Sequence, residues 1–318
     1  MSNSEQQQLE LRLRRAERAL GKLDVVDAVR RVRAIIGPEN IPDSEAEAQA
    51  ALELMRNGQA PSPLQLEALE IVVRLMRPVM LSRNGVLDDL PDDGDHKLYS
   101  QADKDRWSKF RDLVSKVLYS VGRVELKTSH KGTGFIVGDG LLATNRHVLA
   151  ALTSGSEVLR PGAARVVLKQ ELDSTNPKEH VVPIEGVAAI HPKFDMVLLR
   201  TAKLGRDAVA VSTVAATNEA QVVVIGYPAD DRSNNPLFLS GVFNGRFGVK
   251  RAALGEVLDG TESPTLFHDC STTQGNSGSP VFDLLTGKAV GIHRAGFFMY
   301  RNEAVDADAL GSFIRNAG

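Results

Sequence analysis

The chain has 318 residues, of which 42% are hydrophobic and 25% are charged, a composition typical of a globular protein. Its formal net charge of −2 gives no overall attraction for nucleic acid or an anionic membrane, so we expect neither as a partner. A single cysteine, Cys270, excludes a disulfide within the chain, and no apolar run approaches the roughly 20 residues that cross a bilayer.

The first residues, MSNSEQQQLELRLRR, are polar and charged and lack the apolar core of a secretion signal, so we expect a cytoplasmic protein. Apolar residues then recur three or four positions apart, which is the spacing of a helix face. The first face consists of Leu9, Leu13, Ala16 and Leu20. Ser44 and Ser62 are placed to cap two later helices. Residues 1–82 are therefore predicted to form a small helical domain for regulation or interaction, which would bind an activating protein or associate with itself.

Residues 83–119 are predicted to form an acidic linker and a connecting helix. The segment VLDDLPDDGDH, from Val86 to His96, holds five aspartates within eight positions, and their mutual repulsion favours exposure. A helical pattern follows, carried by Trp107, Phe110, Leu113, Val114 and Val117.

From residue 120 the pattern changes to short β-type runs separated by Gly, Pro, Asn and Asp. Examples are VGRVELKT, ARVVLKQE, MVLLRTA, QVVVIGYP and GKAVGIH. Regular short strands without helices between them are typical of an all-β barrel or sandwich. The final DADALGSFIRNAG is expected to form a closing helix. The predicted fold is thus mainly β over residues 120–318, preceded by the helical domain.

Three motifs in the β region carry chemistry when they are considered together. His147 follows the strand in GTGFIVGDGLLATNRHV, Asp195 precedes the apolar strand in HPKFDMVLLR, and Ser277 lies in the turn STTQGNSGSPV. Each alone has an ordinary reading as a structural histidine, a turn cap or a simple turn. Together they offer a hydroxyl nucleophile, an imidazole base and a carboxylate that orients it. The backbone N–H groups of Gly275 and Ser277 would converge on a developing oxyanion.

The runs TNRHV, FDMVLLR, VIGYP and QGNSGSPVF, followed by VGIH, resemble the trypsin-like serine peptidases over about residues 120–316. The resemblance is strongest to the bacterial glutamyl endopeptidase branch. It implies two six-stranded β-barrels with the catalytic triad in the cleft between them. His147 would be the general base, Asp195 its orienting partner and Ser277 the nucleophile, with the oxyanion bound by the N–H groups of Gly275 and Ser277.

In glutamyl endopeptidases, a threonine five residues before the nucleophile and a later histidine contact the acidic side chain of the substrate. Thr272 and His293 match these positions, so the resemblance implies cleavage after Glu or Asp. The alternative, that the two side chains only satisfy each other or the backbone, stays open. Arg294, Ala295 and Gly296 would pair with the substrate backbone, although the family usually has an aromatic residue and a glycine at the first two positions.

The predicted function is a serine endopeptidase that cleaves a protein or peptide partner and is regulated by its helical domain. In one hypothesis the acidic linker is an internal pseudosubstrate or a self-cleavage site; in the other it is a solvated spacer. A catalytically silent scaffold that binds protein partners through the helices is the alternative function. A nucleic-acid adaptor built on the early arginines is disfavoured by the net charge.

Other candidate chemistry is weaker. Cys270 lacks an oxyanion turn, so it is interpreted as a buried structural thiol. His180, His191 and His268 are scattered and no cysteine pair exists, so neither a metal site nor a cofactor is expected.

Overall fold

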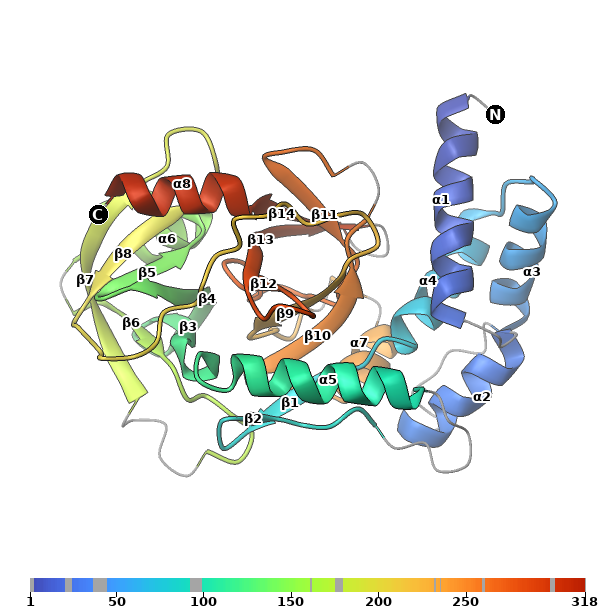
Figure 1. Cartoon of the computed structure of the whole chain (residues 1–318), viewed down its shortest axis with the longest axis horizontal. Coiled ribbons are helices and arrows are strands. Elements are labelled where there is room, and N and C mark those ends of the chain that lie inside the picture. The colour runs from blue at the N-terminus through green and yellow to red at the C-terminus, as the bar shows by residue number, and fades with distance from the viewer. Residues whose placement is uncertain are drawn as a thin grey trace.

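The computed structural model describes residues 3–20, 25–36, 45–91, 99–160, 162–174, 180–231, 233–234, 236–258, 261–297 and 301–317. Helices come first along the chain, and two sheets with a few further helices follow (Figure 1). Within the described ranges, no helix is long and apolar enough to cross a membrane.

The N-terminal region folds into helices α1 (Asn3–Leu20), α2 (Val25–Ile36), α3 (Glu45–Arg56) and α4 (Pro63–Leu75). Their buried faces share a core that includes Leu20, Leu52, Met55 and Leu69. The prediction that Ser62 caps a helix is confirmed, because its hydroxyl accepts the Gln65 N–H at 3.3 Å and the Gln65 side chain accepts the Ser62 N–H at 2.9 Å. Ser44 lies outside the described residues. Where this region ends as a domain stays a prediction.

Two short strands follow α4, and the sequence analysis missed both. They are β1 (Val79–Arg83) and β2 (Val86–Leu87), joined by a turn in which Asn84 and Gly85 have positive φ. β1 adds to a sheet formed much later in the chain, with Val79 opposite Ala253 on β10 (Arg251–Glu256). A five-residue run beside an acidic segment does not reveal such a distant partner.

The first sheet closes on itself as a barrel in the order β3-β4-β5-β8-β7-β6, which confirms one of the two predicted barrels (Figure 1). Its strands are β3 (Val121–Leu126), β4 (Ser129–Gly138), β5 (Leu141–Thr144), β6 (Ala164–Val167), β7 (Val181–Ile190) and β8 (Val197–Thr201). Alternate residues such as Val124, Ile136 and Leu199 fill its interior.

The second sheet differs from the expected six-stranded barrel. It has eight strands in the order β11-β14-β13-β12-β9-β10-β1-β2 and is not closed over the described residues. Its remaining strands are β9 (Gln221–Gly226), β11 (Thr265–His268), β12 (Pro280–Asp283), β13 (Ala289–Phe297) and β14 (Arg301–Asp306). β1 occupies the edge of β10, and only a single bridge, from Val257 to His268, connects the end of β10 to β11. We call this the open sheet.

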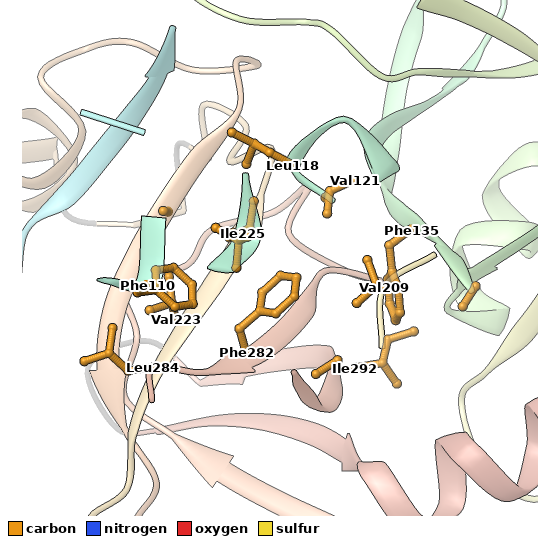
Figure 2. Close-up of a cluster of buried hydrophobic side chains, with 14 of the residues drawn as sticks. Phe110, Leu118, Val121, Phe135, Val209, Val223, Ile225, Phe282, Leu284 and Ile292 are labelled. Carbon is orange, nitrogen blue, oxygen red and sulfur yellow. The ribbon is translucent and has the colours of Figure 1, made fainter. Parts of the chain in front are cut away.

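The predicted connecting helix forms as α5 (Gln101–Val114), although Leu113 of its apolar pattern is 43% exposed. The helix lies along the open sheet, which the sequence did not predict (Figure 1). Figure 2 shows Phe110 of this helix beside Val223 and Phe282, in the core that continues toward the barrel residue Phe135. The Phe110 and Phe282 rings meet edge to face, 6.2 Å apart. Residues before and after position 120 therefore share one hydrophobic core.

The remaining helices are short: η3 (Leu118–Ser120), α6 (Arg146–Thr153), α7 (Pro236–Phe243) and α8 (Ala307–Ala317). α8 is the predicted closing helix, and it packs on β13 and β14. α6 and α7 were not predicted.

A cluster of buried and half-buried charges joins the N-terminal helices to the open sheet. We define this charge cluster as Arg15, Glu70, Arg74, Arg77, Glu256 and Asp269. Arg77 contacts Asp269 and lies 3.0 Å from the Glu256 carboxylate, and Arg15 lies 3.7 Å from Asp269. Asp269 also accepts the Glu256 backbone N–H at 2.8 Å. The helices are thus anchored directly to the segment that leads into the loop carrying Ser277.

The acidic linker is only partly described. Asp88 pairs with Arg83, and Asp89 pairs with Arg111. The other aspartates of the pseudosubstrate hypothesis, Asp92, Asp93 and Asp95, lie outside the described residues.

Candidate active site

The barrel brings His147 and Asp195 together. His147 stands in the first turn of α6, directly after β5, and Asp195 lies in the turn before β8. The His147 Nδ1 atom is 2.6 Å from Asp195 Oδ2, and the His147 backbone N–H donates to Asp195 Oδ1 at 3.0 Å. Asn145 supports the same turn by donating to the Asp195 backbone carbonyl at 2.8 Å. With Nδ1 committed as a donor to the carboxylate, the Nε2 atom of His147 is left to accept a proton.

Electrostatics keep this carboxylate ionised. Burial raises the pKa of Asp195, but the hydrogen bonds from His147 and the attraction of its ring hold that pKa below the ordinary value overall. The side chain of Asp195 is 24% exposed and that of His147 is 48% exposed. The carboxylate is thus charged at neutral pH, and the His147 ring is within reach of an incoming molecule.

The loop that carries Ser277 depends on two glycines. Gly275 and Gly278 have φ of +89° and +87°, a region that side chains rarely adopt. A Cβ on Gly275 would lie 2.5 Å from the His130 ring, and one on Gly278 would lie 2.1 Å from the Thr133 carbonyl oxygen. The conformation of the loop and its contact with the barrel therefore both require glycine.

The peptide groups of this loop are oriented by hydrogen bonds to their carbonyls. Ala229 donates to the Gln274 carbonyl at 2.6 Å, and Ser279 donates to the Asn276 carbonyl at 2.9 Å. In a trans peptide the N–H points opposite to the C=O, so the N–H groups of Gly275 and Ser277 are turned away from these anchors. Among the described residues, neither N–H donates to another group. Two free neighbouring donors are what an oxyanion requires.

Ser277 itself is held against the barrel through its backbone. Its carbonyl accepts the N–H of Thr133 on β4 at 2.8 Å, and the next residue, Gly278, donates to the His293 carbonyl at 2.8 Å. His147 is close enough to His293 to lower its pKa. Over the described part of the chain, no hydrogen bond joins the Ser277 hydroxyl to the His147 ring, and such contacts are often long before a substrate binds.

Thr272 and His293 are partnered, but not with each other. The Thr272 hydroxyl donates to Asn302 Oδ1 at 2.9 Å, and the Asn302 amide donates to the Cys270 carbonyl at 2.5 Å. His293 Nδ1 lies 3.2 Å from His268 Nε2. The sequence analysis missed Asn302 and treated His268 as scattered. Only the pairing of β11, β13 and β14 brings them to this place, and sequence spacing does not reveal that pairing.

The two histidines of this pair are neutral. Burial lowers the pKa of His268 to about 3, and the charge of Arg74 adds to the effect. Burial also lowers the pKa of His293 well below its ordinary value, with smaller contributions from His268 and His147. Since both rings are uncharged, one ring donates and the other accepts in the bond between them.

Arg294, Ala295 and Gly296 lie on β13. The Arg294 guanidinium contacts Glu303 on β14 at 2.5 Å, so its charge is compensated inside the sheet. The pairing of β12 with β13 ends at Ile292, while β14 continues along the other side of β13. One side of residues 294–296 thus faces no strand in the described part of the chain, and it is open to an extended peptide.

The other candidate groups have structural surroundings. Cys270 is a buried free thiol whose pKa burial raises far above its usual range. His180 stacks on Tyr119, and His191 stacks on Phe194. In the ranges that the structure describes, no group of three or more His, Cys, Asp or Glu residues is arranged to hold a metal ion.

The closed barrel, the His147–Asp195 pair and the glycine-framed loop of Ser277 define the trypsin-like peptidase class. The family model for the trypsin-like peptidase domain matches residues 132–292, half of the chain, and the chain belongs to this family. No curated protein matches the chain significantly.

Two solved structures are similar to part of this chain. The serine endoprotease from Yersinia pestis is 16% identical with a TM-score of 0.49, over 65% of this chain and 66% of that chain. An inactive form of Rv3671c from M. tuberculosis H37Rv is 18% identical with a TM-score of 0.45, over 65% of this chain and 90% of that chain.

Proposed function

We propose that the protein is a serine endopeptidase that cleaves a protein or peptide partner. The observation that carries the proposal is the 2.6 Å bond between His147 and Asp195, in a chain of the trypsin-like peptidase family. The two free N–H groups on the loop of Ser277 support it.

In the proposed reaction each of these groups has a defined role. The Ser277 Oγ attacks the scissile carbonyl and gives its proton to His147 Nε2. Asp195 stabilises the imidazolium that forms, and the N–H groups of Gly275 and Ser277 bind the oxyanion. His147 then donates the proton to the leaving amine, and water hydrolyses the acyl-enzyme by the same steps.

We further propose that the enzyme prefers Glu or Asp before the cleaved bond, as the resemblance to glutamyl endopeptidases suggests. The neutral pair of His268 and His293 supports this preference. If His268 donates to His293 Nδ1, the Nε2–H of His293 is left to donate to a substrate carboxylate. An apolar side chain would leave that donor unpaired, which is costly in a buried pocket. Arg294 adds little charge, because Glu303 compensates it.

Regulation through the N-terminal helices is part of the same proposal. The charge cluster connects α1 through Arg15, and α4 through Arg74, to Asp269, three residues before Thr272. A partner that changes how these helices dock would therefore act on the segment leading into the pocket.

A fluorophosphonate probe tests the proposed function. Ser277 Oγ bonds to phosphorus, the P–F bond breaks, fluoride leaves and the serine proton passes to His147. The full chain should be labelled and Ser277→Ala should not, while Ser108→Ala, on the exposed face of α5, should be labelled like the wild type. Labelling of Ser277→Ala, or an unreactive wild type, would overturn the proposal. The second result would favour the catalytically silent scaffold.

A further inference from the structure

We propose that the side-chain hydroxyl of Thr133 is a positioning group for the oxyanion site, because it holds the Gly275 peptide from the neighbouring barrel. The inference rests on the proposed peptidase function. Thr133 lies on β4 and touches neither substrate nor the reacting atoms, so its effect passes through the loop.

The hydroxyl of Thr133 makes two hydrogen bonds, one as donor and one as acceptor. It is buried, and its Oγ1 donates to the Gly275 carbonyl at 2.7 Å. The same oxygen accepts the backbone N–H of Tyr227 at 3.2 Å. With one bond given and one received, the direction of the hydroxyl proton is fixed toward Gly275.

The backbone of Thr133 holds the other oxyanion residue. Its N–H donates to the Ser277 carbonyl at 2.8 Å, and its own carbonyl accepts the Thr144 hydroxyl at 2.6 Å. Thr133 thus binds the carbonyls of both Gly275 and Ser277, the two residues whose N–H groups are free. The backbone bond survives any substitution except proline, so the hydroxyl bond can be tested separately.

Gly275 needs such an external constraint. At φ of +89° and without a Cβ, it has neighbouring backbone conformations of similar energy. The Ala229 bond to the Gln274 carbonyl fixes the peptide before Gly275, and the Thr133 hydroxyl fixes the peptide after it. The Asn276 N–H of the same peptide donates to the Thr273 carbonyl at 3.2 Å, so without the hydroxyl this peptide keeps one longer hydrogen bond among the described residues. A displacement of the order of 1 Å in a catalytic group lowers rates by about 100-fold.

The position of Thr133 also links the strand pair that carries His147 to the loop that carries Ser277. β4 pairs with β5, with Phe135 opposite Ala143, and His147 follows at the end of β5. The barrel that positions His147 therefore also binds the loop that carries Ser277.

The test compares Thr133→Val, which has nearly the same shape, with Thr133→Ser, which keeps the hydroxyl. The matched control is Thr201→Val, because Thr201 is a buried threonine on β8 of the same barrel. Its hydroxyl bonds, among the residues that the structure describes, only to the Ala202 carbonyl at 3.1 Å. Saturation kinetics with the fluorophosphonate probe give kinact and KI, and the end point gives the fraction of protein that is competent to react.

Thr133→Val is expected to lower kinact by about 10- to 100-fold, with KI and the final labelled fraction unchanged. Thr133→Ser should stay within about threefold of the wild type and Thr201→Val should match it, since each keeps the bond to Gly275. If the valine variant does not fold, Thr133→Ala makes the same comparison without a branched side chain.

Three results would overturn the inference: an unchanged kinact, a serine variant as slow as valine, or a smaller labelled fraction that reacts at the wild-type rate. The last would mean that the hydroxyl serves only folding. A wild type that does not react at all would instead defeat the proposed function, and the inference with it.

Discussion

The closed barrel and the open sheet protect their strand edges in different ways. The barrel joins β6 to β3 and has no free edge. The open sheet receives β1 on β10 and α5 against its core, and both come from chain that precedes the family-matched residues 132–292. The matched segment therefore does not contain the whole open sheet and its core, because β1 and α5 lie within residues 79–114.

The two regions also differ in how they place the histidines of the candidate site. The barrel presents His147 at its surface, bonded to an ionised carboxylate. The open sheet buries His268 and His293 as a neutral pair. One region therefore contributes a group that can exchange protons, and the other contributes groups whose protonation is suppressed.

Removing an aromatic ring from α5 is the strongest test of this dependence. Phe110 is fully buried against Phe282 of the open sheet. Phe110→Ala should lower the free energy of unfolding by about 3–5 kcal/mol, through lost burial and the cavity left behind. Denaturant titration measures the loss, and Lys109→Ala, exposed on the same helix, should stay within about 0.5 kcal/mol of wild type. A change no larger than that of the control would show that the sheet is independent of α5.

A substitution in the charge cluster tests whether these ion pairs attach the N-terminal helices to the open sheet. Asp269→Asn would leave Arg15 and Arg77 buried without their shared carboxylate, which should lower the free energy of unfolding by about 3 kcal/mol. Thermal and denaturant unfolding measure it. Arg14→Ala, which breaks only an exposed pair with Glu10, should change stability by about 0.5 kcal/mol or less. Equal effects of the two substitutions would mean that the cluster does not hold the helices.

The buried histidine pair predicts a dependence of stability on pH. The pKa of His268 is about 3 when folded and 6.5 ordinarily, so between these values the unfolded chain binds more protons. Stability should therefore fall as pH drops from about 6.5 toward 3, with up to about 1.4 kcal/mol per pH unit for each such histidine. His268→Asn should flatten the slope of unfolding free energy against pH by up to that amount. Parallel slopes for the two proteins would contradict the burial of a neutral ring.

The smallest effect is expected on the surface of the barrel. Lys203 and Asp139 form an exposed pair with 3.2 Å between Nζ and Oδ2. Lys203→Ala should change the free energy of unfolding by less than about 0.5 kcal/mol and leave probe labelling unchanged. A larger loss would mean that the barrel also relies on charge contacts.

The sequence predicted those parts of the fold that local patterns encode. The run GTGFIVGDGLLATN gave a hairpin because glycines and alternating apolar residues mark its turn and strands, and β4 and β5 form there. The partner of β1 is 174 positions away in the chain, from Val79 to Ala253. No local pattern therefore predicts that β1 pairs with β10, or that the second sheet stays open. Leu113 fits the helix period of α5 and is still largely exposed, because periodicity does not state how wide the covered face is.

The candidate site shows the same division. His147, Asp195 and Ser277 stand in short motifs whose chemistry is recognisable in the sequence. His268 and Asn302 have ordinary neighbours in the chain and reach the site only through strand pairing. Thr133 lies in the motif GTGFIVGDGLLATNRHV, but its bond to the Gly275 carbonyl depends on how the loop of Ser277 packs on the barrel. Side chains that act by hydrogen-bonding to residues far away in the sequence are therefore not recognisable from their neighbours in the chain.

The pairing of β1 with β10 has a consequence for synthesis of the chain. The ribosome completes Val79 long before it reaches Ala253, and at 5–20 residues per second the interval is roughly 10 to 35 s. For that time the apolar β1 has no strand to pair with, and an unpaired strand is a template for aggregation. During this time β1 has to be kept from pairing with other chains. Codon changes that slow translation between Val79 and Ala253 should therefore reduce the yield of soluble protein.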